Sequence, residues 1–385
     1  MANGQGYYRY PDICGDEIVF VCEDDLWKVS SLGGTAIRLT TNLGWAGNPK
    51  FSPDGSFIAF TGVEEGHSEV YLIPSVGGEL KRLSHLGATM TSVLSWNDEG
   101  DTIYFRSNHG RAMARQSSIF AQALQGGLPR DLQYGEATEV AFGPGRAVVL
   151  ARWSSDPARW KRYRGGRAGV LLIDPLGSDE FEKLIELPGN LAAPMWINDR
   201  VYFVSDHEGI GNIYSCRPDG KDLKRHSHHE DFYARSPSTD GLKIVYHAGG
   251  DLFILDPRKS DGGELVEIDF RSPSSQVNRR FVSASKYMED YDLHPEGHSI
   301  TLTARGKVFS LPHWEGAVNH VGDRDGSRFR LARWLHDGER IVTLSDESGE
   351  ERIQVRDPQG KKKVKVLKAL DFGRPFALES APNSD

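Results

Sequence analysis

The sequence predicts an all-β protein, a β-propeller of four-stranded blades in which six blades form one ring, followed by the start of a second propeller. One order of strands and turns recurs along the chain with a period of about 40 residues, the size of one such blade. Apolar residues alternate at period two, and no helical stripe of useful length is present. These patterns exclude an α-solenoid.

The clearest repeat lies at residues 49–84. Its Ser-Pro-Asp-Gly segment, 52–55, predicts a tight hairpin turn, because proline presets φ and glycine accepts a positive φ. Gly77 and Gly78 supply the same freedom at a second hairpin. Similar units occupy residues 18–39, 94–132, 140–185, 201–220 and 239–263.

A polar segment at residues 271–280 interrupts this rhythm. We therefore expect a six-bladed propeller at 1–270, a linker at 271–284, and two blades and a stub of an incomplete second propeller at 285–385. The last unit, starting at Phe376, stops where the other units have their hairpin turn, which indicates a fragment. A single eight-bladed ring is the alternative, and the linker argues against it.

Composition limits the partners and the compartment. The net charge of −8 argues against nucleic acid or an anionic membrane as the main partner. No apolar run has the length of a membrane helix, and the N-terminus has no features of a secretory signal. Cys14, Cys22 and Cys216 are few and lack metal-type spacing, so we expect a cytoplasmic protein.

Catalytic motifs are absent: the chain contains no G-x-S-x-G, H-E-x-x-H, P-loop or dinucleotide fingerprint. We expect no catalytic residue, no cofactor and no metal site. The histidine-rich stretch 226–231 is predicted to be a solvated loop, and residues 323–326, which faintly resemble a calcium loop, are predicted to form a turn. Lys361, Lys362 and Lys363 are interpreted as a charged edge or a solvated strand face.

One insertion carries a candidate peptide-binding site. Five cations and two aromatic residues lie close together in an acidic chain: Arg159, Trp160, Lys161, Arg162, Tyr163, Arg164 and Arg167. Guanidinium groups bind carboxylates bidentately and rings cover apolar side chains, so this pattern suits a peptide carboxylate. The alternative is a structural loop that packs on a neighbouring blade or subunit.

Several segments resemble the N-terminal region of the tricorn protease family. They are Tyr10–Trp27, Trp160–Gly166, Asn212–Leu223 and Tyr291–Ser299, and the resemblance covers essentially the whole chain in order.

The resemblance implies a large cytoplasmic serine peptidase that assembles as a hexamer and degrades oligopeptides. In this family a six-bladed propeller precedes a seven-bladed one, and the catalytic domains lie nearer the C-terminus. This chain would then be a non-catalytic fragment, inactive alone, whose propeller acts in gating and assembly. A stand-alone TolB-like propeller that binds proteins or peptides, and a prolyl-oligopeptidase-type propeller, remain alternatives.

Overall fold

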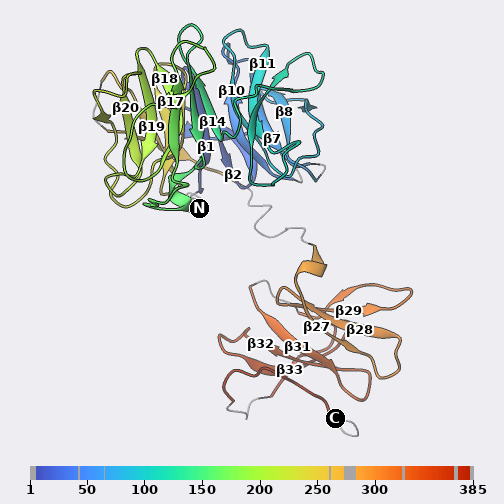
Figure 1. Cartoon of the computed structure of the whole chain (residues 1–385). Coiled ribbons are helices and arrows are strands. Elements are labelled where there is room, and N and C mark those ends of the chain that lie inside the picture. The colour runs from blue at the N-terminus through green and yellow to red at the C-terminus, as the bar shows by residue number, and fades with distance from the viewer. Residues whose placement is uncertain are drawn as a thin grey trace. The chain divides into compact units, whose positions relative to one another are not determined.

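The computed structural model describes residues 6–41, 44–64, 66–259, 262–272, 283–322, 326–367 and 372–381. The chain divides into two compact units, residues 1–276 and 277–385 (Figure 1). Within the described ranges every regular element is a strand except two short 3-10 helices, η1 (Pro157–Arg159) and η2 (Ala284–Lys286). No helix in these ranges has the length and apolar character needed to cross a membrane. Most of the expected linker, residues 273–282, lies outside the described residues, as do Asp323–Asp325.

The first unit contains six four-stranded antiparallel sheets, which we call blades 1 to 6 in chain order. Blades 1 to 3 comprise β1 (Arg9–Cys14), β2 (Glu17–Cys22), β3 (Asp25–Ser30), β5 (Ile37–Arg38); β6 (Ala46–Phe51), β7 (Phe57–Gly62), β8 (Glu69–Pro74), β9 (Lys81–Arg82); β10 (Thr91–Trp96), β11 (Thr102–Ser107), β12 (Ser118–Ala123) and β13 (Arg130–Asp131). Blades 4 to 6 comprise β14 (Glu139–Phe142), β15 (Val148–Arg152), β16 (Val170–Asp174), β17 (Glu182–Lys183); β18 (Leu191–Ile197), β19 (Arg200–Ser205), β20 (Asn212–Cys216), β21 (Lys224–Arg225); β22 (Arg235–Thr239), β23 (Ile244–Ala248), β24 (Asp251–Leu255) and β25 (Glu264–Leu265).

The predicted turn at residues 52–55 is present and its bonds explain it. The Gly55 N–H donates to the Ser52 carbonyl (2.8 Å), and Gly55 has φ of 71°. Asp54 Oδ1 accepts from the Ser56 N–H (3.0 Å), which holds the hairpin between β6 and β7. The glycine therefore acts as the sequence predicted, and Asp54 adds a bond within the turn.

The blades form a closed ring. The first strand of a blade contacts the first strand of the next in most of the ring, and β1 contacts β22 of blade 6. Asp12 on β1 accepts a hydrogen bond from Ser238 on β22, and its other oxygen accepts from the Phe51 N–H of blade 2 (2.7 Å). A parallel pair of short strands, β4 (Gly34–Thr35) and β26 (Ile268–Asp269), joins the end of the ring to blade 1. Blade 6 therefore packs directly on blade 1, as a ring of six blades requires.

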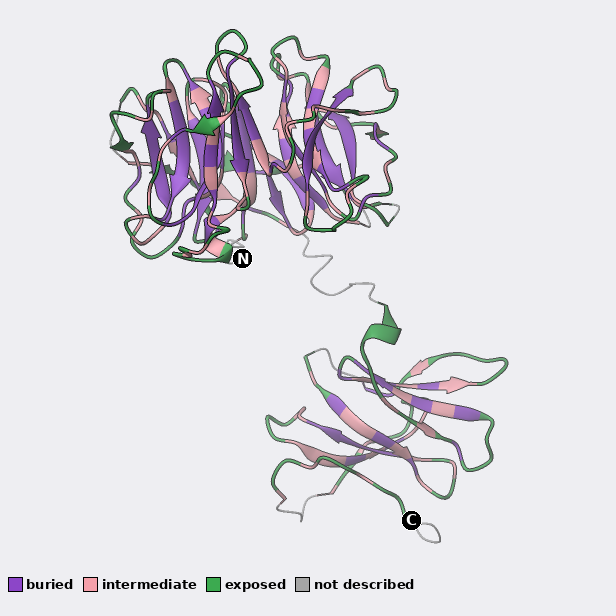
Figure 2. Cartoon of the chain, viewed as in Figure 1, coloured by how far each residue is buried: buried purple, intermediate pink, exposed green. Residues whose placement is uncertain are grey.

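The core lies between adjacent blades. Blade 1 residues such as Phe20 and Trp27 share one apolar cluster with Val245 and Leu252 of blade 6. Equivalent clusters join blades 1 and 2, 2 and 3, 3 and 4, 4 and 5, and 5 and 6. Buried residues consequently run along the strands of the ring, whereas the turns are exposed (Figure 2). Because both faces of most blades are covered, strands such as 58–60 are continuously apolar.

The axis-lining strands share an irregularity that the sequence did not predict. The register shifts within β1, β6, β18 and β22, and a non-glycine residue with positive φ lies at each shift. These residues are Tyr10, Asn48, Ala193 and Ser236, with φ of 48°, 48°, 54° and 45°. Each bulge bends its strand and changes which side chain faces the axis.

The second unit contains two more four-stranded sheets. They are formed by β27 (Met288–Leu293), β28 (Ser299–Ala304), β29 (Lys307–Pro312), β30 (Asn319–His320); β31 (Phe329–Trp334), β32 (Ile341–Ser345), β33 (Arg352–Arg356) and β34 (Lys365–Val366). Asp292 Oδ2 accepts from the Trp334 N–H at 2.7 Å, which reproduces the bond from Phe51 to Asp12 between blades 1 and 2. Residues 376–381 carry no regular strand, so the blade expected to begin at Phe376 stays a prediction.

Candidate functional site

The candidate residues lie in one long connection of blade 4, between β15 and β16. We call residues 153–169 the mouth loop. It contains η1, whose N-cap Asp156 accepts from the Ala158 N–H (3.1 Å) through Oδ1. Proline at the first helical position has no N–H to lose there, so this short turn forms where the sequence has Asp-Pro.

Blade 5 anchors the middle of the mouth loop. The Arg162 N–H donates to Asp206 Oδ2 (2.6 Å), and the Asn190 side-chain amide donates to the Trp160 carbonyl (2.9 Å). Asp206 also accepts from the Asn190 N–H (2.7 Å), so one carboxylate holds both segments. Arg162 has φ of 56°, and these bonds stabilise that backbone conformation.

Blade 6 anchors the beginning of the mouth loop. Arg235 donates from Nε (3.1 Å) and Nη2 (2.5 Å) to Asp156 Oδ2. Burial opposes the charge on Arg235, but the hydrogen bonds to Asp156 outweigh burial and raise the pKa of the guanidinium. Arg235 is the first residue of β22, which lines the axis. The mouth loop therefore extends from blade 4, past blade 5, to the axis-lining strand of blade 6, at one end of the ring that we call the mouth.

The structure brings all seven candidate residues together on this loop, and the five cations are exposed. Arg159 Nε lies 3.9 Å from Asp156, and Arg167 Nη2 lies 3.1 Å from Glu136. The Lys161 ammonium lies 5.5 Å from the centre of the Tyr233 ring.

In the part of the chain that the structure describes, Lys161, Arg162 and Arg164 form no ion pair. The Trp160 and Tyr163 rings pack on each other with centres 5.0 Å apart, and Trp160 remains 61% exposed. The backbone of the mouth loop therefore packs on neighbouring blades, and its charged groups face solvent.

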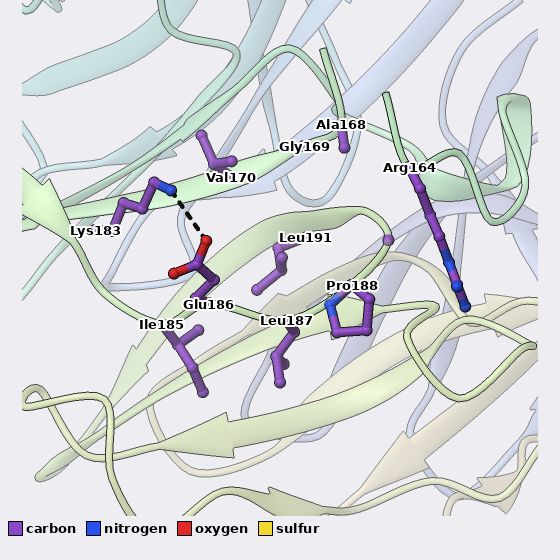
Figure 3. Close-up of a pocket in the computed structure, with 11 residues that line it drawn as sticks. Arg164, Ala168, Gly169, Val170, Lys183, Ile185, Glu186, Leu187, Pro188 and Leu191 are labelled. Carbon is purple, nitrogen blue, oxygen red and sulfur yellow. Dashed lines mark hydrogen bonds and ion pairs between the residues drawn. The ribbon is translucent and has the colours of Figure 1, made fainter. Parts of the chain in front are cut away.

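A pocket of about 240 Å³ adjoins the end of the mouth loop. Figure 3 shows Arg164 at one end of it and Lys183 with Glu186 at the other. The apolar lining comes from Val170, Ile185, Leu187, Pro188 and Leu191. This pocket could not be predicted from the sequence, because its walls come from the mouth loop, from β16, β17 and β18, and from the connection between blades 4 and 5.

Charged groups inside the ring near the mouth were also not predicted from the sequence. Glu139 Oε2 accepts from the Ala193 N–H (2.6 Å), and burial raises the pKa of Glu139 to about 7 although Arg106 opposes the shift. Burial lowers the pKa of Arg106. The sequence did contain one signal of this buried charge, because Glu139 lies directly before the apolar run 140–142.

The histidine-rich stretch does not converge on one point. His226 Nε2 bonds to Ser215 (2.7 Å), and His229 Nε2 bonds to Tyr246 (2.9 Å) on a different blade. A different group, His294, Glu296 and His298, has ligand atoms within 4.8 Å of one another. Both ring nitrogens of His294 are already bonded, to the Gly338 carbonyl (2.8 Å) and the Glu296 N–H (3.0 Å), which argues for a structural role.

With this geometry established, comparison with known proteins identifies the family. The sequence-family model described as the tricorn protease N-terminal β-propeller domain matches residues 5–261 of this chain. The chain belongs to the tricorn protease family.

Two relatives match almost the whole chain. Tricorn protease homolog 1 of Streptomyces coelicolor is 35% identical over 98% of this chain and 36% of its own length. The tricorn protease homolog of Saccharolobus solfataricus is 32% identical over 98% of this chain and 35% of its own length. A crystal structure of the tricorn protease superposes with a TM-score of 0.77 and 26% identity, over 97% of this chain and 36% of that chain. The chain thus spans about one third of the length of these relatives.

Proposed function

We propose that this chain is the non-catalytic N-terminal propeller region of a cytoplasmic, tricorn-type serine peptidase. Its ring gates the passage of oligopeptide substrates or products and contributes to assembly of a hexamer. Family membership supports the peptidase parent, because the matched relatives are named tricorn proteases. Without a nucleophile, its base and oxyanion donors, the chain by itself is inactive towards peptides.

One observation carries the gating role. The mouth loop is anchored to blades 5 and 6 and presents Lys161, Arg162 and Arg164 to solvent with no ion pair among the described residues. A free peptide carboxylate is a matching ligand for such groups, since guanidinium binds it bidentately. The chain as a whole carries a net charge of −8 and repels anions, so the attraction of anionic peptide ends is confined to local clusters of cations such as this one.

The experiment compares one oligopeptide with a free C-terminal carboxylate and the same peptide amidated, by fluorescence anisotropy at fixed salt. We expect tighter binding of the acid, and the double variant Arg162→Ala/Arg164→Ala to lower its affinity about tenfold while leaving the amide nearly unchanged. Arg217→Ala/Lys221→Ala removes two exposed cations on blade 5 and is the matched control. Equal losses of affinity for the acid and the amide would mean that the mouth loop has only a structural role.

We infer further that residues 285–385 begin a second, seven-bladed-type propeller. The bond from Trp334 to Asp292, which repeats the contact between blades 1 and 2, supports this. The alternative is that this chain is a stand-alone TolB-like binding propeller, and the mouth loop is compatible with that function as well. The reading frame after Asp385 distinguishes the two: a downstream hydrolase region supports the peptidase parent, and an immediate stop codon supports the alternative.

A further inference from the structure

The pocket beside Arg164 is open to solvent, and its lining combines aliphatic side chains with charged ones at its two ends. Val170, Ile185 and Leu187 are only partly buried, although Ile185 and Leu187 pack against the cluster between blades 4 and 5. Leu191, at 2% exposure, lies among the lining residues. The pocket therefore reaches the apolar core from the surface, and its partly exposed side chains gain from being covered.

The size of the pocket suits one apolar side chain. Its volume is about 240 Å³. Protein cavities of about 150 Å³ lined by aliphatic residues bind benzene. A leucine or phenylalanine side chain therefore fits, and a larger body, such as a folded domain, does not.

The charges at the two ends of the pocket differ and set an orientation. At one end the Lys183 ammonium lies 3.4 Å from the Glu186 carboxylate, so its charge is already neutralised. The Glu186 carboxylate also repels other anions at this end. At the other end Arg164 has no ion pair among the described residues (Figure 3). A carboxylate attached to an apolar side chain is thus favoured at the Arg164 end only.

We propose that this pocket is a side-chain subsite for the C-terminal residue of a peptide, with the carboxylate on Arg164 and an apolar side chain against Val170, Ile185 and Leu187. The proposal rests on the proposed function and adds a substrate preference to it. Peptides ending in leucine or phenylalanine are then bound in preference to peptides ending in glycine.

The test uses the whole 385-residue chain and four labelled tetrapeptides, Ala-Ala-Ala-Phe and Ala-Ala-Ala-Gly, each as the free acid and as the amide. We expect the Phe acid to bind about tenfold more tightly than the Gly acid. Ala168→Leu fills the pocket, so we expect it to remove the preference for the Phe acid without lowering the affinity for the Gly acid. Val170→Thr, which keeps the volume but adds a hydroxyl, reduces the same ratio. Ala123→Leu, which adds the same side chain at an exposed position on blade 3, is the control.

The two proposals fail in different ways. Equal affinities for the Phe and Gly acids, or a preference for Phe that survives both Ala168→Leu and Val170→Thr, overturn the subsite. Equal affinities for acid and amide forms overturn the proposed function, and the Phe-to-Gly ratio of the amides then still reports on the pocket. Absence of binding by all four peptides overturns both.

Discussion

At the scale of single residues, the mouth of the ring depends on charges that meet from distant parts of the sequence. Asp156 and Arg235 are 79 residues apart, yet they form a close bidentate contact. The sequence predicted the cations of the mouth loop because they are contiguous. It did not predict Asp156 as an anchor, since its partner Arg235 is placed by the packing of blades 4, 5 and 6 and by no local pattern.

His247 gives a pH-dependent prediction at this scale. It is 2% exposed, its Nδ1 has no hydrogen-bond partner among the described residues, and burial, with Arg235 nearby, lowers its pKa to about 3. The unfolded chain takes up a proton near pH 6.5 while the folded chain does not, so this residue reduces stability as the pH falls. Between pH 7 and pH 5 we expect a loss of about 2 kcal/mol from this group.

The measurement is urea unfolding of the chain and of His247→Leu at both pH values. The variant should lose less stability than the unaltered chain over this interval, by about the same 2 kcal/mol. If both proteins lose the same amount, the histidine is not the neutral buried group described here.

At the scale of elements, the turns and the strands followed from sequence, and the bulges did not. Proline, aspartate and glycine act locally, so the hairpin at 52–55 was predictable. Tyr10 and Ser236 adopt positive φ because axis-lining strands must bend, and neither residue type signals that conformation. The outer edge also repeats an unpredicted contact: Thr40, Ser84 and Ser227 each accept from the N–H of a third-strand residue, at 3.0, 2.9 and 2.9 Å.

The mouth loop is held as one element, which predicts resistance to trypsin despite its exposed cations. Cleavage after Lys161, Arg162 or Arg164 requires the loop to detach from blades 5 and 6. Asp156→Asn removes the charge that holds Arg235, and we expect cleavage in the loop to accelerate about tenfold. The measurement is the rate of appearance of the two fragments by mass spectrometry.

A matched control for that experiment is Asp222→Asn. Asp222 pairs with Arg200 (2.7 Å) on blade 5, and this contact does not involve the mouth loop. Its cleavage rate in the loop should match that of the unaltered chain. An Asp156→Asn rate equal to this control would show that the ion pair does not restrain the loop.

At the scale of the whole molecule, the six repeats predicted a ring, and the contacts between β1 and β22 and between β4 and β26 close it. The packing of successive blades in turn determines the site, because it brings the blade 4 loop to the axis-lining strand of blade 6. Repeats are read from one sequence, whereas a pocket made by β16, β18 and an inter-blade connection depends on blade packing that no local pattern reports.

We propose that peptides bind at this mouth by their free C-terminus, and a cross-linking map tests this binding. A peptide with a photoreactive residue next to a free C-terminal carboxylate is irradiated with the chain, and the attached residues are found by mass spectrometry. We predict attachment within 159–170 and 185–191, and loss of that attachment when the peptide is amidated. Attachment spread over the outer hairpins, or unchanged by amidation, would contradict the claim.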